Sequence, residues 1–380
     1  MKIGIDTHAI TKSFAAGSST YVAELVRALV AVDHQNEYVL YAERNDPFYQ
    51  EFVNNHRVKV RLVLPTNPVI RDFVTVPRAI AQDAIDVAHL HFILPPLIRS
   101  ASVLTVFDLY YVHLDRLSLY IKAHGLLTAW SIRRAKNIIT ISEYSKRDIA
   151  HTFAIDLAKI FVTPLGIGQC FSPVGDQKVH AVIHRIGIHQ EYILFVGRTE
   201  EPRKNLMTLI EAYAVLKTQF NTTAQLVIVG RLGAGTKPIL QRVSELRLDR
   251  DVIMPGIIAS EDLPALLSGA KVFVYASSFE GFGLPVLEAM ACGTPVITSN
   301  ATSLPEVAGN AALMVTPGKV GELVETLLLV LRDEALRHDM REQGLRRARL
   351  FSWERTARET LAVYERAVKL RRRNTFDQQR

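Results

Sequence analysis

The sequence FEGFGLPVLEAMACGTPVIT, residues 279–298, is the most informative stretch of the chain. Its proline, Pro285, is tolerated at the first position of a helix because the amide proton that proline lacks would be unpaired there. Apolar side chains follow at helical spacing, and Gly293 stands where a left-handed residue commonly ends a helix. The pattern predicts a short helix over residues 284–292 whose N-terminus faces a glycine loop.

The start of this helix is suited to binding an anion. A helix N-terminus offers unpaired amide groups and a partial positive charge, and Gly281 and Gly283 allow a ligand to approach the backbone closely. Glu280 precedes the helix and Glu288 lies one turn inside it. Two carboxylates here can accept hydrogen bonds from the paired hydroxyls of a sugar or a ribose, or act as acid and base in glycoside hydrolysis. A capped surface helix with solvated glutamates is the simpler alternative, but such a helix does not need this glycine pattern.

The motif EGFGLPVLEAMACGTPVI resembles the signature of retaining, nucleotide-sugar-dependent glycosyltransferases of the GT-B fold, specifically glycosyltransferase family 4. The resemblance implies an α/β architecture in which two Rossmann-like domains, each a doubly wound parallel sheet, face a cleft. It also implies a C-terminal helix that crosses back to the first domain. Glu280 would be catalytic. The positions that the resemblance assigns to donor binding in this motif are Gly281, Phe282, Gly283, Leu284 and Glu288.

Strand-like and helical runs alternate in both halves of the chain. This alternation by itself predicts parallel, doubly wound sheets, which bind ligands at the carboxyl ends of their strands. The strand-like runs of the first half are residues 2–6, 37–42, 58–64, 87–92, 103–107 and 137–141. Those of the second half are residues 192–198, 225–230, 252–258, 272–276 and 311–315.

Three residues of the first half are assigned to the acceptor side of the site. They are Gly17, in the loop before the first helix, and His91 and Asp108, at the ends of strands. The family usually carries a His-Asp pair where this chain has Phe107 and Asp108. The phenylalanine indicates an altered pocket, a substitute histidine such as His91 or His113, or lost catalysis. A histidine satisfied by local hydrogen bonds is the commoner situation for either of these histidines.

The second half begins with YILFVGR, residues 192–198, followed by PRKNL. Arg198 closes a strand and Lys204 lies at the start of the next helix, so both can converge on one anion. A planar guanidinium and a point-charge ammonium together suit a diphosphate, although a solvated pair is the alternative. The two segments match the family's diphosphate-binding region, which implies catalytic roles for both side chains. The resemblance also places Gly256 and Ile257 beside the nucleotide base, and it leaves Arg203 outside the site.

The predicted domain boundaries follow from composition and from the positions of proline and glycine residues. Residues 1–170 form the acceptor-binding domain, 171–190 a linker with no clear apolar period, and 191–351 the nucleotide-sugar-binding domain. Residues 352–380 form the crossover helix and a basic tail.

Composition excludes several classes of protein. With 380 residues, 48% of them hydrophobic and 22% charged, the chain is typical of soluble globular proteins. It contains no run of about 18 apolar residues and no signal peptide, so we expect a cytoplasmic protein. Its two cysteines form neither a disulfide framework nor a CxxC metal motif. No metal-spaced histidine cluster is evident, and the cations Arg198 and Lys204 can take the place of a metal at the leaving group, so we expect no metal and no cofactor.

The net charge of +7 favours anionic partners. Nucleic acid is not supported, because the basic residues have neither a recognised motif nor interleaved aromatic residues. Two segments are basic. One is a predicted helix over residues 120–136 that contains Trp130 and Arg134, and the other is a tail that contains Lys369 and Arg371. Each is either a solvated edge or a peripheral contact with an anionic inner-membrane surface.

These observations predict a retaining glycosyltransferase that uses a nucleotide diphosphate-sugar as substrate. The sequences of the PRKNL and EGFGLP segments favour transfer of a hexose to a glycan or lipid-linked acceptor in cell-surface polysaccharide synthesis. Mannose is the favoured hexose and GDP-mannose the favoured donor. The alternatives are a nucleotide-sugar epimerase and a nucleotide-sugar-binding or regulatory protein that has lost catalysis. The sequence makes no prediction of the oligomeric state, the acceptor or the linkage.

Overall fold

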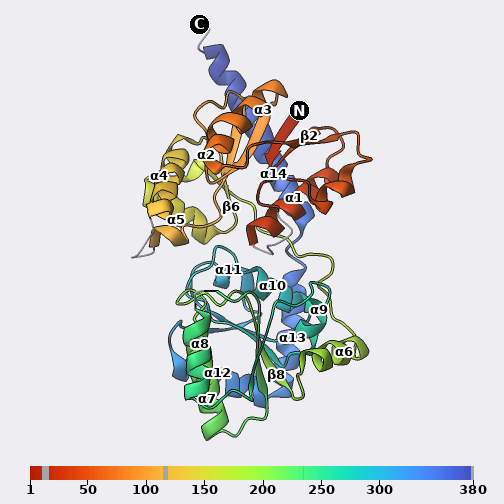
Figure 1. Ribbon diagram of the computed structural model, residues 1–380, viewed down its shortest axis with the longest axis vertical. Helices are drawn as coiled ribbons and strands as arrows, with labels where there is room; N and C mark the ends of the chain where they lie inside the picture. The colour runs from red at the N-terminus through yellow and green to blue at the C-terminus, as the bar shows by residue number, and fades with distance from the viewer. Residues whose placement is uncertain (11–16, 114–118, 234, 378–380) are drawn as a thin grey trace. The chain divides into compact units, whose positions relative to one another are not determined.

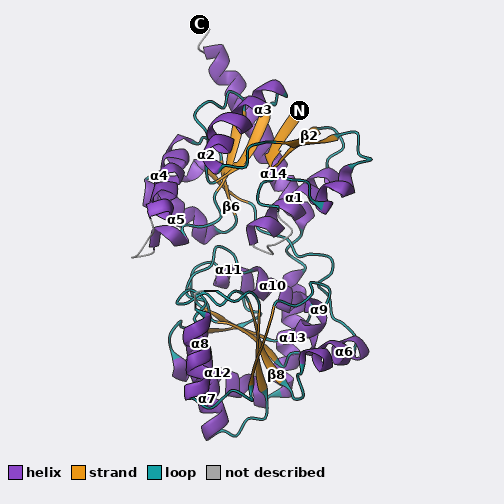
Figure 2. Ribbon diagram, in the orientation of Figure 1, coloured by secondary structure: helices purple, strands orange, loops and turns teal. Residues whose placement is uncertain are grey.

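The computed structural model describes residues 1–10, 17–113, 119–233 and 235–377. The chain divides into two compact units. The first comprises Met1–Gly166 together with Ser352–Arg380, and the second comprises Ile167–Phe351. Each unit is built around a parallel sheet with helices on its faces (Figures 1 and 2).

The first unit contains, in the described part of the chain, a seven-stranded sheet of order β3-β2-β1-β4-β5-β6-β7 in which all neighbours are parallel. The six predicted strands are confirmed to within two residues at each end, and the seventh strand, β7, was not predicted. The bounds are β1 (Lys2–Asp6), β2 (Glu37–Ala42), β3 (Val58–Leu62), β4 (Val87–His91), β5 (Ala101–Thr105), β6 (Ile138–Thr140) and β7 (Ile160–Val162).

Helices cover both faces of this sheet. The last helix of the chain, α14, packs on α1 and β5, while α3, α4 and α5 contribute to the core on the other face (Figure 1). The helices are α1 (Gly17–Val32), α2 (Pro68–Ile70), α3 (Val76–Gln82), α4 (Leu119–Arg134), α5 (Glu143–Phe153) and α14 (Trp353–Asp377). Short turns of helix lie at η1 (Pro47–Phe52), η2 (Arg71–Thr75), η3 (Tyr110–His113) and η4 (Leu157–Lys159).

The predicted crossover of the C-terminal helix is confirmed. The Oγ1 atom of Thr356, in α14, donates a hydrogen bond of 2.5 Å to the carbonyl of Pro164. At Gly166, a Cβ atom would lie 2.1 Å from the backbone nitrogen of Trp353, so only glycine permits this approach. The end of the chain therefore completes the first unit.

The second unit contains, over the described residues, a six-stranded parallel sheet of order β10-β9-β8-β11-β12-β13. The sequence predicted five of these strands. The strand that it missed is β12, which follows helix α10 in the chain. The bounds are β8 (Tyr192–Val196), β9 (Gln225–Val229), β10 (Val252–Gly256), β11 (Val272–Tyr275), β12 (Val296–Ser299) and β13 (Leu313–Val315).

Helices α7, α8 and α12 lie on one side of this sheet, and α9, α10 and α13 lie on the other (Figure 1). This is the doubly wound arrangement that the alternation of strands and helices predicts. The bounds are α6 (Asp176–Ile186), α7 (Leu206–Gln219), α8 (Thr236–Glu245), α9 (Leu263–Gly269), α10 (Leu284–Ala291), α11 (Leu304–Ala308), α12 (Val320–Arg332) and α13 (Glu334–Ala348).

The prediction of a linker over residues 171–190 is wrong. These residues contain α6, which packs on α9 and buries Val179 and Val182. Gly187, with φ of +83°, ends the helix in the left-handed conformation. Pro173 and Gly175 punctuate only the residues before the helix, so they mark its beginning and not a continuous linker.

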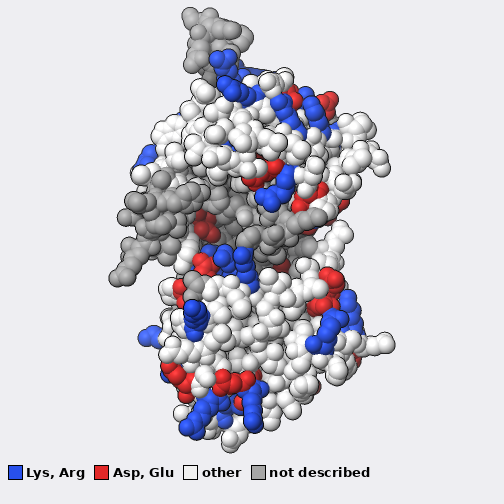
Figure 3. All heavy atoms as spheres, in the orientation of Figure 1, with Lys and Arg blue, Asp and Glu red and all other residues white. Residues whose placement is uncertain are grey.

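The surface is mixed in charge on the face drawn in Figure 3, where Lys and Arg side chains lie next to Asp and Glu side chains. Across the described residues, none of the helices combines the length and the apolarity that crossing a bilayer requires.

Candidate functional site

The predicted glycine loop and helix are confirmed. Helix α10 begins at Leu284 after Gly283, whose φ is +115°. A Cβ atom on Gly283 would lie 2.6 Å from the side chain of Leu304, so both the dihedral angle and the space favour glycine. The helix ends at Cys292, and Gly293 follows with φ of +76°. The start of α10 therefore follows a tightly packed loop, and the amides of Val286 and Leu287 donate to the carbonyl of Gly283.

Glu280 lies in this loop and is buried, with 6% of its surface exposed. Its Oε1 atom accepts hydrogen bonds from Lys204 Nζ at 2.5 Å and from Ser277 Oγ at 2.6 Å. Its Oε2 atom lies 3.5 Å from the guanidinium of Arg203. The structure thus brings together Glu280 and Lys204, two residues that the sequence assigned to one site although they are 76 positions apart.

Two neighbouring loops hold this ion pair in place. Lys204 ends the loop after β8, and Glu280 lies in the loop after β11, the strand that pairs with β8. Asn205 donates a hydrogen bond of 2.9 Å to the carbonyl of Ala276, and the amide of Ser278 donates one of 2.8 Å to the carbonyl of Arg203. The direction of strand order reverses between these two strands, which is where open parallel sheets bind their ligands.

Burial and charge act in opposite directions on Glu280. Burial raises the pKa of its carboxyl group, but the charges of Lys204 and Arg203 outweigh this effect and hold the pKa below its ordinary value. Glu280 is therefore an anion at neutral pH. Lys204 Nζ also donates to Tyr275 Oη at 2.6 Å, so the ammonium group has two protein partners.

Glu288 is in a different environment. It lies one turn inside α10, and its carboxylate has no hydrogen-bond or ion-pair partner among the described residues. Burial raises its pKa to about 7. An acceptor group without a protein partner beside the glycine loop is available to hydroxyl groups of a ligand.

The remaining predicted residues of the second unit stand at the same edge of the sheet. Arg198 follows β8 and is exposed, and no ion pair of its guanidinium is found within the described ranges. Gly256, with φ of +78°, ends β10, and the side chain of Ile257 is 72% exposed. At Gly230, a Cβ atom would lie 2.1 Å from the carbonyl oxygen of Gly197, so the loops after β8 and β9 run in contact.

Sequence reasoning missed several residues that shape the site. Arg203 was left out, but its Nε atom donates to the carbonyl of Phe279 at 3.1 Å and its guanidinium lies beside Glu280. Ser303 Oγ donates to the carbonyls of Glu280 and Phe282 at 2.8 and 2.9 Å. The PRKNL segment contains Arg203 and could have indicated it, whereas no local pattern marks the serine.

The first unit holds the three residues assigned to the acceptor. Gly17 is the exposed first residue of α1, and the carboxylate of Asp108 accepts a hydrogen bond of 3.0 Å from the amide of Tyr110. His91 ends β4 and is buried against Phe107, with ring centroids 6.0 Å apart. His113, the other histidine considered as a substitute, pairs with Asp148 at 3.0 Å.

Neither a metal centre nor a reactive thiol is evident in the described part of the chain. No group of three or more His, Cys, Asp and Glu residues there is placed to hold a metal ion. Of the two cysteines, Cys292 is buried and its pKa is raised by burial to about 12, and Cys170 is exposed. Charge at the site comes from the side chains of Arg203, Lys204 and Glu280.

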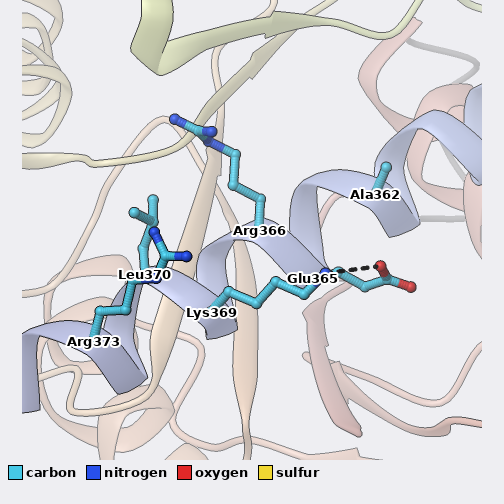
Figure 4. Close-up of a pocket in the computed structure, with 6 residues that line it drawn as sticks. All are labelled: Ala362, Glu365, Arg366, Lys369, Leu370 and Arg373. Atoms are coloured by element: carbon cyan, nitrogen blue, oxygen red, sulfur yellow. Dashed lines mark ion pairs between the residues drawn. The ribbon is translucent and has the colours of Figure 1, made fainter. Parts of the chain in front are cut away.

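A separate, basic hollow lies along α14 (Figure 4). Lys369 lies 3.9 Å from Glu365, and the guanidinium of Arg366 lies 5.2 Å from the ring centroid of Phe161. The hollow is lined by Ala362, Glu365, Arg366, Lys369, Leu370 and Arg373.

Two protein families match the two halves of the chain. Residues 177–347 match "Glycosyl transferases group 1", and residues 15–168 match "Glycosyltransferase Family 4". The chain is 36% identical over 236 residues to "O-antigen chain mannosyltransferase B" of Escherichia coli. It is 33% identical over 241 residues to "MMP alpha-(1->4)-mannosyltransferase" of Mycolicibacterium hassiacum.

The matched regions do not span these relatives completely. They cover 62% of this chain in both cases, 62% of the Escherichia coli protein and 55% of the Mycolicibacterium protein. A solved structure, that of a glycosyltransferase from Rickettsia africae, is similar over 97% of this chain and 98% of its own, with a TM-score of 0.75 and 16% identity. At this level of identity, the similarity concerns the fold.

Proposed function

Because the chain belongs to the glycosyltransferases, matching group 1 in its second half and family 4 in its first, we propose that it transfers a hexose from a nucleotide diphosphate-sugar. The acceptor would be a glycan or a lipid-linked saccharide in cell-surface polysaccharide synthesis. The observation that carries the proposal is the buried Lys204–Glu280 ion pair beside the glycine loop of α10, at the point where the strand order of the second sheet reverses.

The proposed reaction breaks the bond between the anomeric carbon and the diphosphate. Negative charge grows on the diphosphate as the bond lengthens, and positive charge grows on the sugar. Arg198, Lys204 and the positive N-terminal end of the α10 dipole would stabilise the diphosphate. Lys204 is held in place by its bonds to Glu280 and Tyr275, so it needs little reorganisation during the reaction.

Glu280 would act on the sugar. Its lowered pKa keeps it ionised at neutral pH, so it can accept hydrogen bonds from sugar hydroxyls and offset positive charge on the ring. Glu288, whose carboxylate has no partner in the described residues, would accept hydrogen bonds from the ribose hydroxyls. In the proposed retaining mechanism, the acceptor attacks the same face from which the diphosphate departs, and a departing phosphate oxygen takes the acceptor proton.

Mannose is the favoured sugar and GDP-mannose the favoured donor. The support comes from relatives named as mannosyltransferases, of which two are 36% and 33% identical to this chain. We also propose that the reaction needs no metal ion, because protein cations are placed to stabilise the leaving group.

A nucleotide-sugar-binding protein without transferase activity is the second candidate. Phe107 favours it, because this buried residue stands where the family usually carries a histidine and cannot form hydrogen bonds. Binding of a nucleotide sugar with no transfer to any acceptor would support this candidate, and isomerised donor after incubation alone would indicate an epimerase.

We further propose a peripheral contact with anionic lipid headgroups at the cytoplasmic face of a membrane. The basic hollow on α14 supports it, as do Leu126 and Trp130 of α4, which are 73% and 42% exposed. Flotation with phosphatidylglycerol vesicles, compared with phosphatidylcholine vesicles, tests this contact. Equal recovery from both would contradict it.

The transferase proposal is tested by calorimetric titration with GDP-, UDP-, ADP- and dTDP-sugars, followed by mass spectrometry of saccharides incubated with the donor that binds. We expect one donor to bind and one saccharide to gain a hexose. Absence of binding by every donor would overturn the proposal.

A further inference from the structure

A small cavity lies in the first unit, below the carboxyl ends of β1 and β4. Its polar lining consists of Asp6, Arg71, Asp72 and His91, and apolar side chains such as Val76 and Leu90 form the rest of its wall. The cavity measures about 10 Å³, which is room for about one water molecule or one hydroxyl group.

His91 has no hydrogen-bond partner in this cavity. It is 93% buried, since 7% of its surface is exposed, and neither ring nitrogen has a partner. An unsatisfied buried polar group costs about 1–3 kcal/mol, so native structures rarely leave one without a reason. A group that enters the cavity would remove this cost.

His89, two residues earlier on β4, provides a direct comparison. Its ring is stacked on that of His91, with centroids 5.1 Å apart, and it is completely buried. Its Nδ1 atom pairs with Tyr364 Oη and its Nε2 atom with Thr105 Oγ1, both at 2.6 Å. Helix α14 and strand β5 therefore supply the partners of His89, whereas neither ring nitrogen of His91 has one.

The charges around the cavity are already compensated. The carboxylate of Asp6 accepts a hydrogen bond of 2.8 Å from His8 Nδ1 and lies 3.4 Å from the guanidinium of Arg71. Arg71 is also paired with Asp72. Since one guanidinium faces two carboxylates, an incoming phosphate or carboxylate would find no free cation.

A hydroxyl group fits this lining better than an anion does. Burial lowers the pKa of His91 to about 4, so the imidazole is neutral at pH 7 and presents one donor and one acceptor. A hydroxyl group likewise donates one hydrogen bond and accepts others, and the neighbouring carboxylates add further acceptors. The same walls restrict the ligand to a single group of this size.

We propose that this cavity receives one hydroxyl group of a carbohydrate acceptor, with His91 exchanging hydrogen bonds with that hydroxyl and the pair of Asp6 and Arg71 beside it. The identification of the ligand as the acceptor rests on the proposed transferase function. His91 is then a residue that determines which acceptor hydroxyl is recognised, and Phe107 packs against its ring, with centroids 6.0 Å apart.

Saturation-transfer NMR with a panel of methyl glycosides tests the proposal without donor or turnover. The panel contains the α-methyl glycosides of mannose, glucose, galactose and N-acetylglucosamine, and the monodeoxy analogues of whichever binds. We expect one glycoside to bind, and removal of one particular hydroxyl to weaken its binding about 10-fold. In His91→Phe, the parent glycoside and that analogue should bind equally, whereas His91→Gln, which retains a donor and an acceptor, should restore part of the difference.

His34→Gln is the matched control, because His34 is exposed in the same unit and does not line the cavity. This variant should bind the parent glycoside about 10-fold more tightly than the deoxy analogue, as the wild type does, because one hydrogen bond has about this effect. If no glycoside binds to the wild type, if no single hydroxyl matters, or if His91→Phe still discriminates, the proposal is overturned and the cavity holds a structural water. Donor titration measures binding to the second unit separately. The glycoside-binding result can therefore be interpreted even if the transferase proposal fails.

Discussion

Replacement of Lys204 by methionine removes the cation from a buried ion pair while keeping most of the side chain's volume. Glu280 would then remain buried with Ser277 as its hydrogen-bond donor and Arg203 at 3.5 Å. Removing one partner of a buried pair typically destabilises a protein by about 3–5 kcal/mol. Because Arg203 remains in place, we expect the lower end, about 3 kcal/mol.

Hydrogen exchange followed by mass spectrometry is the suitable assay. Both tryptophans, Trp130 and Trp353, lie in the first unit, so tryptophan fluorescence would not report on the second. Peptides covering β11 and α10 should exchange about 100-fold faster in Lys204→Met, the factor that corresponds to a loss of about 3 kcal/mol. The double variant Lys204→Met/Glu280→Gln should recover most of this loss, because the buried carboxylate that lacks its ammonium partner is gone.

The pH dependence has a defined sign. In the wild type the pKa of Glu280 is lowered, so its ionisation stabilises the fold above the ordinary pKa of 4.5, and this stabilisation is lost as pH falls through the lowered value. In Lys204→Met burial acts with less opposition and raises the pKa. The deficit of the variant should therefore shrink as pH falls from 7.5 towards 5.

Lys271→Met is the matched control in the same unit. Lys271 pairs with Glu191 at 2.7 Å, but both side chains are partly exposed, so the loss should stay within about 1 kcal/mol. Equal exchange in Lys204→Met and the wild type, or no recovery in the double variant, would refute the reasoning.

Three further predictions concern the same site. Glu280→Gln should lower kcat about 100-fold or more while the Kd of the donor changes little, and steady-state kinetics with an unchanged kcat would remove Glu280 from the catalytic residues. The pKa of Glu288 is raised from 4.5 to about 7, so its ionisation makes the second unit less stable as pH rises through this interval. Glu288→Gln should abolish this pH dependence of stability in hydrogen exchange between pH 5 and 8. An unchanged pH dependence would show that another group causes it. Treatment with EDTA should leave turnover unchanged, and a strong loss that Mg²⁺ restores would contradict the assignment of the leaving group to protein cations.

The sequence predicted most of the fold because buried strands of parallel sheets are nearly continuous apolar runs. The run YILFV, for example, predicts β8, whereas β7 was not predicted although it is as long as β6, which was. Helix α6 was missed although Val179, Val182, Ile183 and Ile186 recur at helical spacing; the surface that this face packs on, α9, lies far along the chain.

The site was predictable only as far as local motifs reach. The glycines around Glu280 specify the backbone, and the helix they introduce is where it was expected. The bonds that Glu280 makes to Lys204 depend on the pairing of β8 with β11, which no local pattern encodes. The unpaired nitrogens of His91 are likewise a property of the packed unit, since His89, two residues earlier on the same strand, is fully paired. The roles of Arg198 and Glu288 stay predictions.

The central claim is that protein cations at the carboxyl edge of the second sheet hold the diphosphate of a nucleotide. Calorimetric titration of GDP and guanosine into the wild type, Arg198→Ala and the surface control Arg185→Ala measures this contribution directly. We predict that GDP binds the wild type and Arg185→Ala much more tightly than guanosine, and that Arg198→Ala loses about 10- to 100-fold for GDP and nothing for guanosine. Equal affinities of GDP and guanosine for the wild type, or an unchanged GDP affinity in Arg198→Ala, would contradict the claim.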